Sequence, residues 1–250
     1  MKKGLCLGVA ERIIAGGKQL LQDMIGFCAN SHIFRCAADI GYPEYDDLTD
    51  ADAIDNKIAD GVVNVNSGAY AENTLVYRKA VLNVTDGGAI NTTYADGTIN
   101  VTDGGTAENT RINAGGELNV TSATTVNTEI SGVANVNAGA VATGNLVTAV
   151  GTLNVTDGGA IDTTVADGTI NLTNSATAEN TTVNVSGTLN VDNASAMNTT
   201  IAGTANATNG AVLTSNTVTG TLNVTSASAT ENIVSGTMNV SAGANATDNM

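Results

Sequence analysis

The chain has 250 residues, a net charge of −15 and only 3% aromatic residues, with no Trp. Compact domains of this size bury large rings in their cores, so a chain that lacks them is expected to have a thin, regular interior of small side chains. The acidity excludes a nucleic-acid-binding role, because an acidic surface repels phosphate backbones.

Residues 1–60 form an N-terminal region whose composition differs from the rest. The start, MKKGLCLGVAERIIAGG, is not a standard signal peptide, because Glu11 and Arg12 interrupt its apolar run. Apolar residues at helical spacing up to about residue 41 predict one or two amphipathic helices that cover the first rung of the array that follows. We find no apolar run long enough for a membrane-spanning helix.

The stretch EYDDLTDADAIDNKIAD, residues 44–60, carries seven carboxylates. It lacks the D-x-D-x-D-G pattern with a distal Glu that a calcium loop requires. We therefore predict a solvated acidic linker here and no metal site.

Residues 61–250 repeat at two levels. The segment LNVTDGGAINTTYADGTIN, which starts at Leu82, returns 71 residues later as LNVTDGGAIDTTVADGTIN, which starts at Leu153. Within this super-repeat, an apolar-Asn-apolar triplet recurs at steps of 19, 17, 19 and 16 residues. Eleven copies of the triplet are present, so the chain is an array of short structural units.

Each unit has the pattern of short strands joined by sharp corners. In ELNVTSATTVNTEISG, Leu118 and Val120 alternate with Asn119 and Thr121, which predicts a strand with one buried face. A second segment, residues 107–112, shifts its alternation once, which implies a bend at Asn109. Two strands and two Gly-containing corners per rung of 16–19 residues predict an all-β, right-handed parallel β-solenoid of about 11 rungs. The last residues align with the middle of a rung, so we expect the sequence to be part of a longer protein.

The segment VTDGGTAENTRINAGGELNVT, residues 101–121, resembles the Gly-Gly-x-Ala-x-x-Thr-x-Val-x-x-Gly-Gly repeats of AIDA-type autotransporter adhesins. The matching positions are Gly104, Gly105, Ala107, Thr110, Ile112, Gly115 and Gly116. The resemblance implies a β-helical passenger at the bacterial cell surface or in the extracellular space. It also implies roles in cell adhesion, self-association or biofilm growth, and glycosylation of Ser or Thr.

The array offers little for catalysis. It contains no His or Cys, and no Lys after Lys79, so it cannot hold a Ser/His/Asp or Cys/His constellation. The carboxylate pairs Asp86 with Asp103 and Asp157 with Asp162 could serve a glycoside hydrolase only in principle, because each is also an ordinary corner residue. The three Cys, all before residue 37, have no zinc-ligand spacing. We predict no enzyme, no metal and no cofactor.

Outward Asn and Thr residues on successive first strands form a candidate surface array. They read as N-glycosylation sequons, although repeated copying of one unit explains their regularity more simply. The array consists of Asn83, Thr85, Asn100, Thr102, Asn119, Thr121, Asn154, Thr156, Asn171, Thr173, Asn223 and Thr225.

These patterns predict a non-catalytic, adhesin-like passenger at a bacterial surface or secreted from it. Its partners would be host or bacterial surface receptors, or further copies of itself. Two alternatives stay open at this point: a structural fibre or phage-tail-like solenoid, and an ice-binding solenoid that uses the Asn/Thr array.

Overall fold

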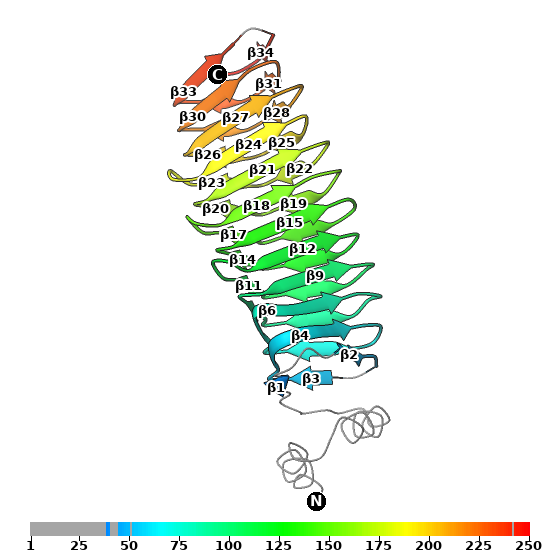
Figure 1. The fold of residues 1–250 in the computed structure, drawn as a ribbon. Coiled ribbons are helices and arrows are strands. Elements are labelled where there is room, and N and C mark those ends of the chain that lie inside the picture. Colours follow the sequence, from blue (N-terminus) through cyan, green and yellow to red (C-terminus); the bar gives the residue numbers. More distant parts are fainter. Residues whose placement is uncertain (1–38, 41–44, 51, 242) are drawn as a thin grey trace, which may run out of the picture.

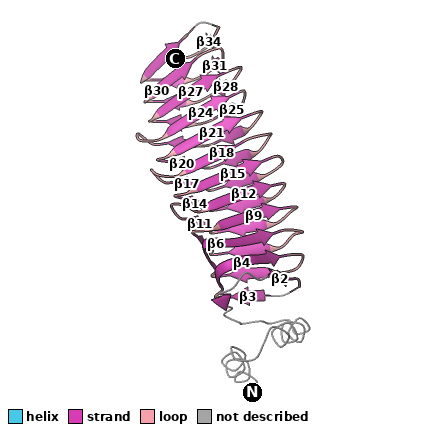
Figure 2. Cartoon of the chain, in the orientation of Figure 1, coloured by secondary structure: helices cyan, strands magenta, loops and turns pink. Residues whose placement is uncertain are grey.

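The chain is an elongated parallel β-solenoid of about 11 rungs, as the sequence predicts (Figure 1). The computed structural model describes residues 39–40, 45–50, 52–241 and 243–250. No helix occurs among these residues, and every strand pairs in parallel with the equivalent strands of the neighbouring rungs (Figure 2). The predicted N-terminal helices fall in residues 1–38 and 41, which lie outside the described residues.

Each rung has three strands, which stack into three columns that we call the first, second and third faces. The first face contains β2 (Tyr45–Leu48), the second half of β4 (Lys57–Val65), the second half of β6 (Leu75–Val84), β9 (Thr98–Thr102), β12 (Glu117–Thr121), β15 (Val133–Asn137), β18 (Thr152–Val155), β21 (Thr169–Thr173), β24 (Thr188–Asp192), β27 (Thr204–Thr208), β30 (Thr221–Val224) and β33 (Thr237–Val240).

The second face is a separate 12-stranded sheet of three-residue strands. It contains β3 (Asp52–Ile54), β5 (Tyr70–Glu72), β7 (Ala89–Asn91), β10 (Thr106–Glu108), β13 (Thr124–Val126), β16 (Val141–Thr143), β19 (Ala160–Asp162), β22 (Thr177–Glu179), β25 (Ser195–Met197), β28 (Val212–Thr214), β31 (Ser228–Thr230) and β34 (Asn245–Thr247).

The third face joins the first in one 22-stranded sheet, because β4 and β6 run through both. Besides the first halves of these two strands, it contains β1 (Asp39–Ile40), β8 (Tyr94–Ala95), β11 (Arg111–Ile112), β14 (Glu129–Ile130), β17 (Leu146–Val147), β20 (Val165–Ala166), β23 (Thr182–Val183), β26 (Thr200–Ile201), β29 (Thr217–Val218) and β32 (Ile233–Val234).

The third strand corrects our expectation of two strands per rung. The predicted bend is present: Asn109 adopts φ of 48°, in the left-handed region that Asn tolerates better than most residues. It separates β10 from β11, which pair in different sheets. A bend this sharp reorients the chain, so the predicted second segment is two strands on two faces.

The unequal rung lengths are explained by two corners. Between the third and first faces, the 19-residue rungs after β6 have four-residue corners such as Asn113–Gly116, whereas the shorter rungs have two residues such as Ser131–Gly132. Between the first and second faces, the corner Asp103–Gly105 shortens by one residue in 16-residue rungs, to Ser122–Ala123. The strands therefore stay in register while the loops absorb the variation.

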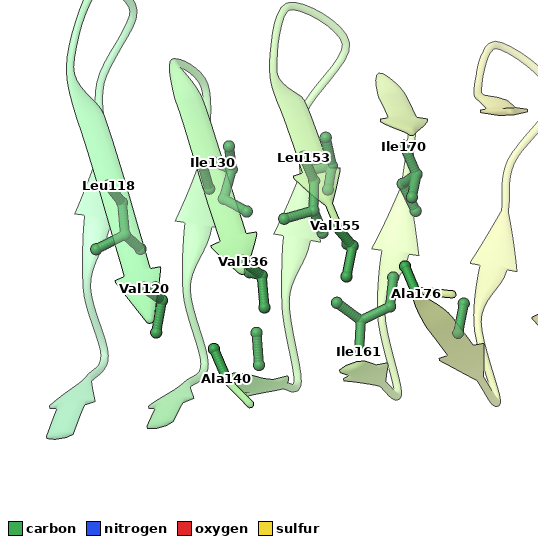
Figure 3. Close-up of a cluster of buried hydrophobic side chains, with 14 of the residues drawn as sticks. Leu118, Val120, Ile130, Val136, Ala140, Leu153, Val155, Ile161, Ile170 and Ala176 are labelled. Atoms are coloured by element: carbon green, nitrogen blue, oxygen red, sulfur yellow. The ribbon is translucent and has the colours of Figure 1, made fainter. Parts of the chain in front are cut away.

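The register of the parallel strands stacks identical or similar residues on one another along the rod. Asn119 pairs with Asn100 below it and Asn135 above it, and Val120 in the same way lies between two Val residues. The inward Leu, Ile, Val and Ala side chains form one continuous core without aromatic rings (Figure 3). Side chains from all three faces meet in it, including Leu118, Ile130 and Ile161, each about 1% exposed.

The prediction of a solvated linker in the acidic stretch is wrong. Ala53 pairs with Ala71, and Ile58 pairs with Val76, so β3 and β4 belong to the same columns as the later rungs. Gly61, where we expected the array to begin, lies inside β4. Carboxylates on outward positions, such as Asp52, obscure the alternation in the sequence, although Ala53 between them packs against the core.

A buried polar column runs inside the corner between the second and third faces. Nearest the C-terminus it is an amide ladder: the Nδ2 of Asn216 donates to the Oδ1 of Asn232 at 2.9 Å, and the Nδ2 of Asn232 donates to the Oδ1 of Asn249 at 2.8 Å. In the middle of the rod the column is less complete, since the Oγ1 of Thr128 and the Oδ1 of Asn145 are buried without a partner. The column thus varies in how well its polar atoms are satisfied.

Candidate functional surface

The outward side of the first face follows from strand alternation. In β12, Leu118 and Val120 point into the core, while Glu117, Asn119 and Thr121 remain partly or fully exposed. The same pattern recurs in each first-face strand, so three outward columns run along the rod, which we call the leading, Asn and trailing columns.

The leading column contains Val62, Val81, Thr98, Glu117, Val133, Thr152, Thr169, Thr188, Thr204, Thr221 and Thr237. The trailing column contains Thr85, Thr102, Thr121, Asn137, Thr156, Thr173, Asp192, Thr208, Thr225 and Ser241. Thr occupies 14 of these 21 positions, and the other seven are Val62, Val81, Glu117, Val133, Asn137, Asp192 and Ser241.

The Asn column is a hydrogen-bonded ladder. From Asn83 onward, each amide Nδ2 donates to the Oδ1 of the Asn one rung closer to the N-terminus, at 2.7 to 3.0 Å. Its members are Asn64, Asn83, Asn100, Asn119, Asn135, Asn154, Asn171, Asn190, Asn206, Asn223 and Asn239. Because an amide has two donors and two acceptor lone pairs, a ladder member within the run keeps one of each beyond the ladder bonds. Asn135 uses its second donor on the Oε1 of Glu117, at 3.2 Å.

The structure places all twelve residues of the predicted surface array on this face. The six Asn residues belong to the ladder, and the six Thr residues lie in the trailing column. A ligand for them stays a prediction. Selection by Asn-x-Thr pairs missed ladder members such as Asn135 and Asn190, whose neighbour two residues later is not Thr.

The leading column was missed as well. The sequence does carry a signal for this column. The residue two positions before each triplet Asn lies on the same outward side of the strand, and it is most often Thr. A sequon is defined by the Thr or Ser that follows Asn, so the sequon pattern does not include the residue two positions before it.

The carboxylates considered for catalysis sit at corners. Asp86 and Asp103 occupy equivalent first corners of successive rungs, both with positive φ. Asp157 accepts a hydrogen bond from Asn174 at 3.3 Å, while Asp162 lies at the outward end of β19 and accepts one from Asn180 at 2.9 Å. These contacts are those of residues that stabilise tight corners.

The described residues contain no group of three or more His, Cys, Asp or Glu placed to hold a metal ion. Likewise, no helix in this part of the chain has the length and hydropathy needed to cross a bilayer.

Comparison with solved structures identifies the architecture. The crystal structure of a TibC-catalysed, hyper-glycosylated TibA55-350 fragment matches this chain with a TM-score of 0.74 and 23% sequence identity. The match covers 88% of this chain and 89% of that chain. The chain shares the fold of the TibA fragment. This agreement supports the resemblance to AIDA-type passenger repeats that the Gly-Gly motifs indicate. No protein-family model matches the chain, and no curated protein matches its sequence.

Proposed function

We propose that this chain is an adhesin-like passenger solenoid that acts by contact along its length, at a bacterial surface or outside the cell. The observation that carries the proposal is the repetitive first face, with its amide ladder flanked by two Thr-rich columns, on a fold shared with the TibA fragment. Contacts repeated at every rung add up through effective concentration, so a long array can bind firmly through individually weak interactions.

Self-association through the first face is the mode that this geometry favours. Between residues 152 and 241 the three outward columns carry one charge, at Asp192, in a chain whose net charge is −15. A nearly uncharged face allows two acidic molecules to approach each other there with little repulsion. The unused amide and hydroxyl groups then supply donors and acceptors in a regular lattice.

A cell-settling assay tests this role with the full chain displayed on a non-aggregating bacterium. We expect displayed wild-type chain to cause clumping and a double variant, Thr169→Glu with Thr204→Glu, to lose it by charge repulsion across the face. Glu117 already occupies the leading column, so Glu is compatible with the fold at these positions. The matched control is Thr177→Glu, on the exposed second face. Equal clumping by the face variant and the control would contradict self-association through this face.

Glycosylation of hydroxyl groups is a second part of the proposal. It comes from the TibA fragment, which was glycosylated by TibC. The outward Thr and Ser residues offer acceptors along the rod, whereas each ladder Asn already donates one Nδ2 proton to its neighbour. Co-production of this chain with TibC should raise its intact mass in sugar increments. An unchanged mass, while the TibA fragment is modified in parallel, would rule out this enzyme as the modifier.

Ice binding is the second candidate function, because one specific observation favours it. From residue 152 onward, each rung of the first face has Thr in its leading column and Asn in its centre. The result is a flat grid with a rung spacing of about 4.8 Å. Thermal hysteresis of the purified chain measures this activity directly, and a value equal to that of a non-binding protein would remove it.

A further inference from the structure

The positive charges of the described chain gather at one place. All four of its Lys and Arg residues, Lys57, Arg78, Lys79 and Arg111, lie on the third face or on the corner that follows it, within successive rungs near the N-terminal end. From residue 112 to the end the sequence contains no Lys or Arg. These strands, β4, β6, β8 and β11, stack in the lower part of the rod (Figure 1).

The exposed aromatic residues lie in the same place. Tyr77 is 42% exposed and Tyr94 is 44% exposed, and no residue after Tyr94 is aromatic. On the third face, Lys57 pairs with Leu75, Leu75 with Tyr94, and Tyr94 with Arg111. The outward column therefore consists, in order, of a cation, an aliphatic residue, an aromatic residue and a cation. Neighbouring members are about 4.8 Å apart.

A shallow, open hollow of about 250 Å³ lies beside this column. An apolar surface is supplied by the side chains of Leu75 and Tyr94, and polar groups come from two rungs. The lining residues are Asp55, Asn56, Lys57, Asn73, Leu75 and Tyr94. The Nδ2 of Asn73 donates to the Oδ1 of Asp55 at 3.1 Å, which holds these two side chains together at the rim.

The mixture of groups selects a class of ligand. Asp55 only accepts hydrogen bonds when ionised, Lys57 only donates, and Asn73 does both, so the rim suits hydroxyl groups. The Tyr94 ring and Leu75 offer a flat apolar patch to the C–H face of a sugar ring. The cations Lys57 and Arg111 lie at either end, although Arg111 also forms an ion pair with Glu129 at 3.2 Å.

We propose that the column Lys57–Leu75–Tyr94–Arg111 and its adjoining hollow bind an acidic oligosaccharide, with a sugar ring on Tyr94 and carboxylates toward the flanking cations. Arg78 and Lys79 follow Leu75 by three and four residues, and Lys79 lies opposite Asp60 of the neighbouring strand. This goes beyond the contact role proposed for the first face, since the site lies on a different face and uses different chemistry. The sugar-binding proposal and the self-association proposal can therefore be refuted independently.

Calorimetric titration of the purified full chain with a hexamer of galacturonic acid tests the site. Saturable binding that weakens as salt is raised is expected, because salt screens the contacts of Lys57 and Arg111. A neutral hexamer, maltohexaose, should bind more weakly.

Variants keep the test specific. Thr occupies the same outward position in β23, β26 and β29, so Tyr94→Thr and Lys57→Thr preserve a side chain that this column accepts. Loss of the ring should weaken the affinity about fivefold to tenfold. Lys57→Thr should weaken it and reduce its salt dependence. Val165→Thr, farther along the third face, is the matched control and should bind as wild type.

Three results would overturn the proposal: no saturable binding of the uronate hexamer, equal affinity of Tyr94→Thr and Val165→Thr, or maltohexaose binding as tightly as the uronate. Tighter binding of a single-stranded oligonucleotide than of the uronate would also overturn it, in favour of a nucleic-acid ligand. The settling assay needs no added sugar, so a negative result here leaves the self-association test unaffected.

Discussion

Replacing Asn154 with Ala would interrupt the Asn column near its centre. The Nδ2 of Asn154 donates to the Oδ1 of Asn135 at 2.9 Å, and its Oδ1 accepts from the Nδ2 of Asn171 at 2.9 Å. Each such bond contributes about 0.5–1.5 kcal/mol net, so losing both should lower the free energy of unfolding by about 1–3 kcal/mol. Partial exposure lets water replace some of the lost contact, which places the expected value in the lower half of this range.

The position along the ladder provides an internal comparison. Asn239 makes only one ladder bond, to Asn223 at 2.8 Å, so Asn239→Ala should cost about half as much as Asn154→Ala. Asn154→Asp retains the acceptor for Asn171 but removes the donor to Asn135, and places a carboxylate against that amide oxygen. At neutral pH this variant should be at least as destabilised as the Ala variant.

Urea unfolding followed by circular dichroism measures these differences. The control is Thr152→Ala, on the same strand and the same side, because Thr152 makes no side-chain hydrogen bond among the described contacts. Surface changes of that kind usually alter stability by less than about 0.5 kcal/mol. If Asn154→Ala and Thr152→Ala lose the same stability within about 0.5 kcal/mol, the ladder does not stabilise the rod and the reasoning is refuted.

Two further predictions concern the corners and the interior. Gly168→Ala should destabilise the rod by about 1–3 kcal/mol, because an added Cβ would collide with the carbonyl oxygen of Thr148 in the previous rung. Gly158→Asn, at φ of 78° with nothing within 4 Å, should change little. Equal melting temperatures for these two variants would contradict that steric argument. Thr128→Asn should stabilise the chain by about 1 kcal/mol, since its new amide can donate to the unpartnered buried Oδ1 of Asn145. A lower melting temperature than wild type would show that the added amide finds no partner there.

Much of the fold could be predicted because the signal is repeated. The alternation of Leu118 and Val120 with Asn119 and Thr121 is weak evidence in a single strand, but eleven copies of the triplet make the inward and outward positions clear. The bend at Asn109 was also predictable, since the alternation shifts there. Where carboxylates obscure the repeat, as at Asp52, the alternation does not identify the strand, and the sequence wrongly predicts a linker in place of the first rung.

The candidate surface was only partly predictable. Asn and Thr could be assigned to the outward side from their phase in the strand, but the hydrogen bonds between them depend on partners 16 to 19 residues away. The cation and aromatic column on the third face could not be identified from the sequence, because its members stand one rung apart but are of different residue types. Lys57, Leu75, Tyr94 and Arg111 are spaced 18, 19 and 17 residues apart and belong to no common motif.

By itself, the sequence determined the rung length, the strand phase and the interior of small side chains, because these depend on local alternation and on turn residues. Only the tertiary structure decided that each rung has three faces, that the acidic stretch joins the array, and which outward residues become neighbours. The physical reason is that stacking at about 4.8 Å converts a separation of one rung in sequence into direct contact. Corner lengths set the register of that stacking, and therefore decide which side chains meet.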